Sequence, residues 1–175
     1  MKMWKKALIA VAAALGVLLL IVVIYLCYVI FSYSRIPDMQ QLSVDAGDTE
    51  SAVKVGETYT VVTQNLGFGA YTDDFTFFMD GGKESRAESR ESVIDCINKG
   101  AQTVENLDPD FILFQEVDLD STRSHHVNQY DMLREHFGDF ASCYAVNYDS
   151  AYLMYPIFEP HGASYSSLAT FSRLI

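Results

Sequence analysis

Residues 110–117 read DFILFQEV, and this stretch decides how the rest of the chain is interpreted. Its apolar run, residues 111–114, is short and continuous, which is typical of a strand buried on both faces. Gln115 and Glu116 follow directly. A carboxylate beside a buried strand is partly desolvated and needs a cation or strong hydrogen-bond donors. The sequence therefore predicts a strand that carries an acidic functional group at its carboxyl end.

A second strand with a polar end is predicted upstream. Residues 58–67 read TYTVVTQNLG, in which residues 58–64 favour a strand and Asn65 and Gly67 favour its end. Residues 86–106 lie between the two strands and predict a helix, because apolar side chains recur there at helical spacing. The apolar face of this helix comprises Val93, Ile94, Ile97, Ala101 and Val104.

The remainder of the chain continues this alternation. Residues 130–137 predict a short helix, residues 141–148 a strand, and residues 167–171 the beginning of another strand. Residues 152–162 contain two prolines and are predicted to form an ordered loop. Strands that alternate with helices indicate an α/β (α+β) fold class.

The N-terminal part of the chain has the composition of a membrane-spanning helix. Residues 7–34 contain no charged side chain, and about 20 apolar residues suffice to cross the hydrocarbon core of a bilayer. A cleaved signal peptide is the alternative, but its apolar core is shorter, roughly 7–15 residues, and ends in small residues. We therefore expect residues 1–35 to form an uncleaved membrane anchor, with a transmembrane helix at about residues 7–30.

Charge divides the chain on either side of this segment. Three lysines precede it and Arg35 follows it, which predicts a cytoplasmic N-terminus and an extracytoplasmic remainder. The whole chain carries 23 acidic and 12 basic side chains, a formal net charge of −11. This balance argues against unaided binding of nucleic-acid phosphates, although a bound metal ion can supply positive charge. Residues 36–57 are polar and without periodicity, which predicts a linker.

Asn65 and Glu116 are the candidate site residues. Each falls at the carboxyl end of a predicted strand, where open sheets of this class bind their ligands. If the two strands are neighbours, the amide and the carboxylate converge on one point. Both supply hard oxygen donors, which suit Mg²⁺, Mn²⁺ or Ca²⁺ rather than zinc. The alternative is that Glu116 forms an ordinary ion pair and Asn65 caps a turn.

Other polar residues allow two interpretations. Arg123 is a candidate for binding a substrate phosphate, and the alternative is a surface ion pair. His125 and His126 fit a surface loop better than a pair of ligands, and His161 fits a turn. In the aromatic and acidic loop of residues 68–85, the acids lack the alternating spacing of an EF-hand and are predicted to be solvated.

Three motifs resemble elements of a known family. Residues 63–67, TQNLG, are similar to its first-strand T-x-N-x element, and residues 110–117 are similar to its D-x-I-x-x-Q-E-V element. Residues 168–173, LATFSR, look like its later G-x-A-x-x-S-R strand, with Ser167 where Gly is common. On these motifs, residues 58–171 resemble the N-terminal half of the endonuclease/exonuclease/phosphatase family, which holds DNase I-like nucleases, inositol-phosphate phosphatases and neutral sphingomyelinases.

The resemblance implies a two-layer β-sandwich flanked by helices and a metal-dependent hydrolase of phosphoester bonds. In the family, the Glu matched by Glu116 binds a divalent ion, usually Mg²⁺, and the Asn matched by Asn65 helps to hold the metal or the phosphate. The family's later His strand, D-x-N pair and closing S-D-H do not occur in residues 117–175. Residues 58–175 are therefore expected to be a truncated first half of the domain, inactive alone.

Two functions follow as hypotheses. The first is a membrane-anchored, metal-dependent phosphoesterase acting on a lipid, a small molecule or a nucleic acid. The membrane tether and the acidic charge favour the first two substrates. The second is a non-catalytic, membrane-anchored binding module that keeps part of the fold. The sequence indicates no protein partner.

Overall fold

The computed structural model describes residues 2–48 and 52–174, and the chain divides into two compact units, Met1–Ser34 and Arg35–Ile175. The first unit is a single helix, α1 (Met3–Phe31), in which no side chain is buried. This helix is long and apolar enough to cross a membrane. The transmembrane helix predicted at about residues 7–30 lies within it.

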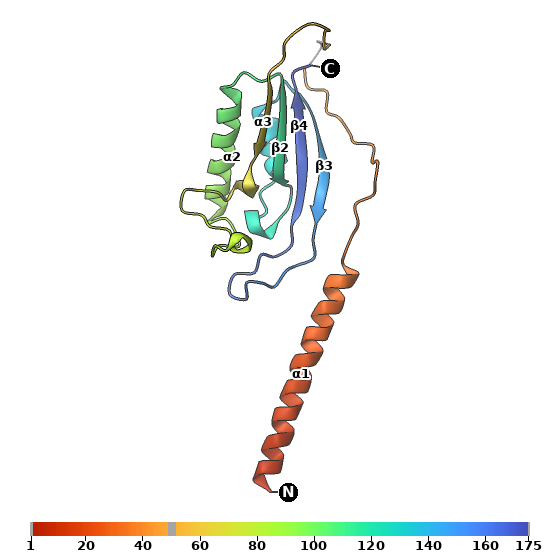
Figure 1. The fold of residues 1–175 in the computed structure, drawn as a ribbon, viewed down its shortest axis with the longest axis vertical. Coiled ribbons are helices and arrows are strands. Elements are labelled where there is room, and N and C mark those ends of the chain that lie inside the picture. The colour runs from red at the N-terminus through yellow and green to blue at the C-terminus, as the bar shows by residue number, and fades with distance from the viewer. Residues whose placement is uncertain (1, 49–51, 175) are drawn as a thin grey trace. The chain divides into compact units, whose positions relative to one another are not determined.

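The second unit, in the part of the chain that is described, contains one four-stranded sheet and two α-helices (Figure 1). Its elements along the chain are β1 (Val61–Asn65), η1 (Gly67–Gly69), η2 (Phe78–Asp80), α2 (Arg90–Glu105), β2 (Phe111–Asp118), η3 (Thr122–Ser124), α3 (Gln129–His136), β3 (Ala141–Asp149) and β4 (Tyr165–Ser172), where η denotes a short 3-10 helix. The predicted mixture of helices and strands is therefore confirmed.

The strands lie in the order β1-β2-β4-β3. β1 pairs parallel with β2, and α2 forms the crossover between them. β4 runs antiparallel to both β2 and β3. β1, β2 and β3 consequently point the same way, and their carboxyl ends share one edge of the sheet (Figure 1). This shared edge is where the sequence predicts the functional site.

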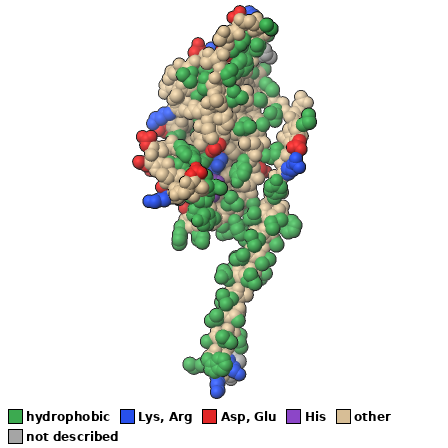
Figure 2. All heavy atoms as spheres, in the orientation of Figure 1, with side chains coloured by type: hydrophobic (Ala, Val, Ile, Leu, Met, Phe, Trp, Pro, Cys, Tyr) green, Lys and Arg blue, Asp and Glu red, His purple; other side chains and the backbone are tan. Residues whose placement is uncertain are grey.

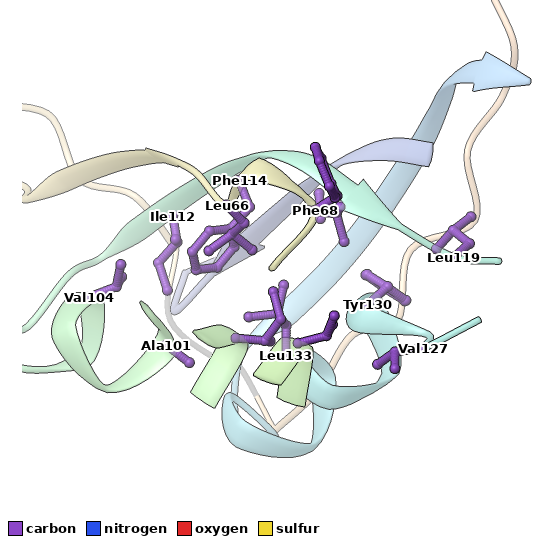
Figure 3. Close-up of a cluster of buried hydrophobic side chains, with 14 of the residues drawn as sticks. Leu66, Phe68, Ala101, Val104, Ile112, Phe114, Leu119, Val127, Tyr130 and Leu133 are labelled. Atoms are coloured by element: carbon purple, nitrogen blue, oxygen red, sulfur yellow. The ribbon is translucent and has the colours of Figure 1, made fainter. Parts of the chain in front are cut away.

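α2 and α3 cover one face of the sheet, and the hydrophobic core lies between the helices and the strands (Figures 1 and 3). The core includes Ile112 and Phe114 of β2, Phe171 of β4 and Leu133 of α3, all fully buried. The buried side chains of α2 are Val93, Ile97, Ala101 and Val104. The apolar face predicted for this helix is confirmed at these four positions.

Within residues 35–48 and 52–174, no helix or further strand covers the opposite face of the sheet. Strand alternation places Val61, Leu113 and Leu168 on this face, and all three are exposed. The structure therefore holds a mixed α+β fold with one sheet of four strands. The second layer of a DNase I-like sandwich stays an expectation of the resemblance.

The bounds of several elements differ by a few residues from the prediction, and β1 and α2 both begin later than predicted. β1 begins at Val61 rather than at residue 58. α2 begins at Arg90 rather than at residue 86, because Ser89 caps it by accepting a hydrogen bond from the Ser92 backbone at 3.0 Å. The residues before this cap are held elsewhere, since the Ala87 backbone donates to the Arg123 carbonyl.

Part of the predicted linker contacts the sheet. The Asp45 backbone exchanges two hydrogen bonds with Ser142 at the outer edge of β3, at 2.8 and 2.7 Å. The carboxylate of Asp45 also forms an ion pair with Arg134 of α3. Residues 49–51 of the predicted linker lie outside the described residues. Asp45 thus covers a short stretch of an otherwise open strand edge.

Candidate functional site

The carboxyl ends of β1 and β2 bring the two candidate residues together. Asn65 is the last residue of β1 and pairs in register with Gln115 of β2. The side-chain Nδ2 of Asn65 donates a hydrogen bond to Oε1 of Glu116 at 2.9 Å. The predicted convergence of an amide and a carboxylate from neighbouring strands is therefore confirmed.

The hydrogen bonds of Asn65 fix which way its amide faces. Its Oδ1 accepts a hydrogen bond from the Gly67 backbone at 2.7 Å, while its Nδ2 faces Glu116. The reversed amide would place oxygen against a carboxylate and nitrogen against an N–H group, so only this orientation is satisfied. The sequence predicts Asn65 as an oxygen ligand, whereas in this geometry Asn65 orients Glu116.

Glu116 is displayed by a β-bulge inside β2. Phe114 pairs with Ala169 and Val117 with Ser167, so β2 contains one more residue than β4 over this stretch. Glu116 itself adopts a left-handed backbone with φ of 55°. Such a conformation costs a non-glycine residue about 1–2 kcal/mol, and bulges often re-aim side chains beside active sites. The strand predicted to end at about Glu116 continues to Asp118.

Glu116 lines an open cleft of about 530 Å³ at this edge of the sheet. The polar side chains around it come from the η1–η2 region, β2, η3, β3 and the β3–β4 loop, and include Tyr71, Asp80, Glu116, Arg123, Asn147 and His161. The cleft thus combines two carboxylates, an amide, a guanidinium and an imidazole in one space.

Arg123 is buried, so the predicted surface position is wrong. Its Nε and Nη2 donate to the two carboxylate oxygens of Asp118 at 3.0 and 2.8 Å, and Asp118 has no exposed surface. Ser124 donates a third hydrogen bond to this carboxylate at 2.8 Å. The guanidinium also lies 4.2 Å from the ring centroid of Phe68. Charged side chains of this kind are almost never buried unless they are paired.

The pairing with Asp118 limits how Arg123 can hold a substrate. The edge formed by Nε and Nη2 is occupied, so this edge cannot grip a phosphate. Within the described ranges, no group other than Asp118 accepts a hydrogen bond from the guanidinium. Arg123 lines the cleft. The N–H groups of its Nη1 edge are therefore available to bind an anion.

His161 is buried, although the sequence predicts that it belongs to a turn. Its ring is 3% exposed, and Nδ1 donates to the Ser85 carbonyl at 2.9 Å. Burial lowers the pKa of His161 below its ordinary value of 6.5 because the charged imidazolium is desolvated. The imidazole is consequently neutral at pH 7, and its Nε2 carries a lone pair 3.4 Å from the Ser164 hydroxyl.

The lowered pKa of His161 predicts a stability that declines in mild acid. The unfolded chain takes up this proton near pH 6.5, before the folded chain does, so the stabilisation is present above that pH and is lost as the pH falls. His161→Asn keeps a donor for Ser85 but does not titrate. Denaturation midpoints measured between roughly pH 7.5 and 5.5 should fall less steeply for this variant than for the wild type. Equal slopes would contradict the assignment.

The pKa of Tyr71 reflects the negative charge around Glu116. Burial raises this pKa, and the charges of Asp80 and Glu116 raise it further. Two carboxylates therefore act on the same phenol from within one cleft. The sequence alone interprets Asp80 as a solvated loop acid, and the fold brings it to the site.

The donors of the cleft fit an open Mg²⁺ site better than a closed metal cage. Glu116 and Asp80 supply carboxylates and Asn147 an amide, all hard oxygen donors. Mg²⁺ usually takes one or two carboxylates and keeps several waters together with substrate phosphates. Among residues 2–48 and 52–174, no three His, Cys, Asp or Glu side chains come close enough together to hold a metal ion. A cation bound in this cleft would therefore need water and substrate to complete its shell.

His125 and His126 lie outside this cleft. Both adopt left-handed backbone angles at the end of η3. His126 is exposed and pairs with Asp120, while a ring nitrogen of His125 lies 2.8 Å from the Ala87 carbonyl. The interpretation of His126 as a surface-loop residue is confirmed.

Comparisons with known proteins give no assignment. No family model matches the chain, and neither a curated protein nor a solved structure matches it. The resemblance carried by residues 63–67, 110–117 and 168–173 therefore stays a prediction from the motifs.

Proposed function

We propose that this chain is part of a membrane-anchored, metal-dependent hydrolase of phosphoester bonds, of the endonuclease/exonuclease/phosphatase type. The observation that carries the proposal is the contact between Asn65 and Glu116, 2.9 Å long, at the shared carboxyl edge of β1 and β2. Two of the three motifs that carry the resemblance thus meet at this contact, beside an open cleft. Residues 168–172 of the third motif lie in β4, beside β2.

Each polar group of the cleft has a role in this proposal. Glu116 holds the cation with the carboxylate that Asn65 orients, and Asp80 adds negative charge nearby. Arg123 binds the substrate phosphate through its Nη1 edge, while Asp118 keeps the guanidinium in place. Glu116 would hold a Mg²⁺ ion, whose chemistry when bound would be to polarise the phosphoryl oxygen and stabilise the departing oxygen.

The anchor in this proposal is α1. Its apolar length suits a bilayer, and the lysines that precede it favour an N-terminus in the cytoplasm. The acidic domain then lies on the extracytoplasmic side. The tether keeps the cleft near the bilayer, which favours lipid or small phosphoesters over nucleic acids as substrates.

Binding of Mn²⁺ to the purified chain in nanodiscs tests the cation site. Glu116→Gln preserves size but removes the charge, so Mn²⁺ affinity should fall at least about 10-fold. Asn65→Leu should weaken it by about 10–100-fold, because the carboxylate loses its orienting donor. Asp73→Asn is the control. It changes an exposed acid in the loop of residues 68–85, which also contains Asp80, and should leave the Mn²⁺ affinity unchanged. Equal Mn²⁺ binding by the wild type and Glu116→Gln would refute the proposal.

A second candidate function is a non-catalytic, membrane-anchored binding module. The Nη1 edge of Arg123 favours it, since this guanidinium lines the cleft and can bind an anion without a metal. Hydrolysis of a phosphodiester by the full-length protein separates the two. Activity that is abolished by EDTA and by Glu116→Gln supports the hydrolase, and anion binding without turnover supports the module. A downstream sequence with the family's His strand, D-x-N and S-D-H would also support the hydrolase.

A further inference from the structure

The loop between β3 and β4 presents an apolar tip to solvent. Residues 150–158 read SAYLMYPIF and contain no charged side chain. Tyr155, Ile157 and Phe158 have exposed fractions of 67%, 78% and 102%. Met79, from the neighbouring η2, is also exposed. Figure 2 shows apolar side chains gathered at this end of the domain. We call these four side chains the apolar tip.

The apolar tip is held away from the core by bonds at its base. Leu153 and Gly162 exchange two backbone hydrogen bonds, at 3.1 and 3.0 Å, and the His161 backbone donates to the Tyr155 carbonyl at 3.1 Å. The ring of Tyr155 lies 5.8 Å from that of Phe78, which joins the loop to η2. A loop fixed in this way cannot fold its apolar side chains inward. Exposed apolar clusters of this kind mark interaction surfaces.

The apolar tip and the cleft open at the same end of the sheet. β3 ends at Asp149, at the edge shared with the carboxyl ends of β1 and β2 (Figure 1). Met79 belongs to the tip and also lines the cleft that contains Glu116. Whatever surface covers the tip is therefore adjacent to the candidate site.

A lipid bilayer is the surface that this chain itself brings within reach. Residues 32–44 join α1 to Asp45, which pairs with β3, and a chain of that length spans at most about 45 Å when fully extended. Aromatic and aliphatic side chains without charge are the composition of segments that enter the headgroup region of a bilayer. The tip lacks Lys and Arg, so it suits zwitterionic lipids rather than an anionic surface.

We propose that the apolar tip inserts into the surface of the bilayer that holds α1, and that this docking presents the cleft to lipid headgroups. The inference rests on the proposed anchoring by α1, and it narrows the substrate class to phosphoesters of membrane lipids. Insertion is driven by burial of Tyr155, Ile157 and Phe158 and does not require catalysis.

Tryptophan fluorescence in the full chain tests the insertion. Trp4 is the sole tryptophan, so Trp4→Phe gives a silent background. Phe158→Trp places a probe in the tip, and Leu107→Trp places a matched probe at an exposed position in the turn before β2, at the other end of the sheet. In phosphatidylcholine vesicles with brominated acyl chains, the Phe158→Trp probe should lose about half of its emission, because inserted side chains reach roughly 5–10 Å into the interface. The Leu107→Trp probe should lose none.

A second change and a washing step distinguish the possible failures. Adding Ile157→Glu to the Phe158→Trp probe should restore the emission, since a charge opposes insertion. Equal emission from the tip and Leu107 probes, in chains that remain in the vesicles after an alkaline wash, would overturn the docking but not the anchoring. Chains removed by the wash would overturn both. A blue shift at the Phe158→Trp probe without quenching would assign the tip to a protein surface, such as a second copy, and overturn the proposal.

Discussion

Replacing Asp118 with alanine is expected to lower the free energy of unfolding by about 3–5 kcal/mol, because the change leaves the buried charge of Arg123 without its partner. The Asp118 carboxylate accepts two hydrogen bonds from Arg123 and one from Ser124, and it has no exposed surface. Without it, the guanidinium must remain charged beside the ring of Phe68 or move to water. Either outcome disrupts the wall of the cleft.

Chemical denaturation of the chain in detergent measures this loss. Asp95→Ala is the matched control, because Asp95 forms an ion pair with Lys99 on the exposed face of α2. Removing an exposed pair changes stability by at most about 1 kcal/mol. The double change Asp118→Ala with Arg123→Met should recover part of the loss, since no unpaired charge then remains. A loss for Asp118→Ala as small as that of the control would show that the pair is not buried in solution.

Phe171→Ala is expected to cost about 3–5 kcal/mol of stability through the cavity that it leaves. Phe171 lies on β4 and is fully buried. Its ring lies within 6 Å, centroid to centroid, of three other aromatic rings, which belong to β2, to α3 and to the turn after α3. These neighbours are the rings of Phe114, Tyr130 and Phe137, at 5.9, 5.9 and 5.6 Å. The residue thus joins the sheet to its helical layer.

The matched control for this change is Phe158→Ala, which removes the same ring from an exposed position. Surface substitutions of this kind usually change stability by less than about 0.5 kcal/mol. Thermal unfolding of both variants in detergent provides the comparison. Similar losses for the two phenylalanines would contradict the assignment of Phe171 to the core and of Phe158 to the surface.

Local patterns in the sequence predict the elements whose burial depends on periodicity. The apolar face of α2 and the buried strand at residues 111–114 follow from helical spacing and from a continuous apolar run. The contact between Asn65 and Glu116 also follows, because parallel neighbouring strands end at the same edge. The first two predictions need only the local sequence, whereas this contact also requires β1 and β2 to be neighbours in the sheet.

Local sequence patterns do not predict the structural features that depend on contacts between distant residues. The bulge at Glu116 exists only relative to β4, which lies about fifty residues downstream in the chain. Arg123 and Asp118 are separated by five residues with no helical or strand periodicity that would place them together. His161 and Asp80 reach the cleft through loops whose paths depend on tertiary contacts. The sequence identifies His161 and Asp80 as titratable residues, but it does not predict that they lie in the cleft.

The extra residue in β2 determines both the pairing of Val117 with β4 and the position of Glu116. It lets Val117 enter the core at Ser167 of β4 while Glu116 stays beside Asn65. Deleting a single residue between Phe114 and Val117 would keep Phe114 opposite Ala169 and Val117 opposite Ser167, so the ladder would be unbroken. The left-handed backbone that aims Glu116 into the cleft would then be lost. A change in length at this point therefore affects the cleft more than it affects the pairing of the sheet.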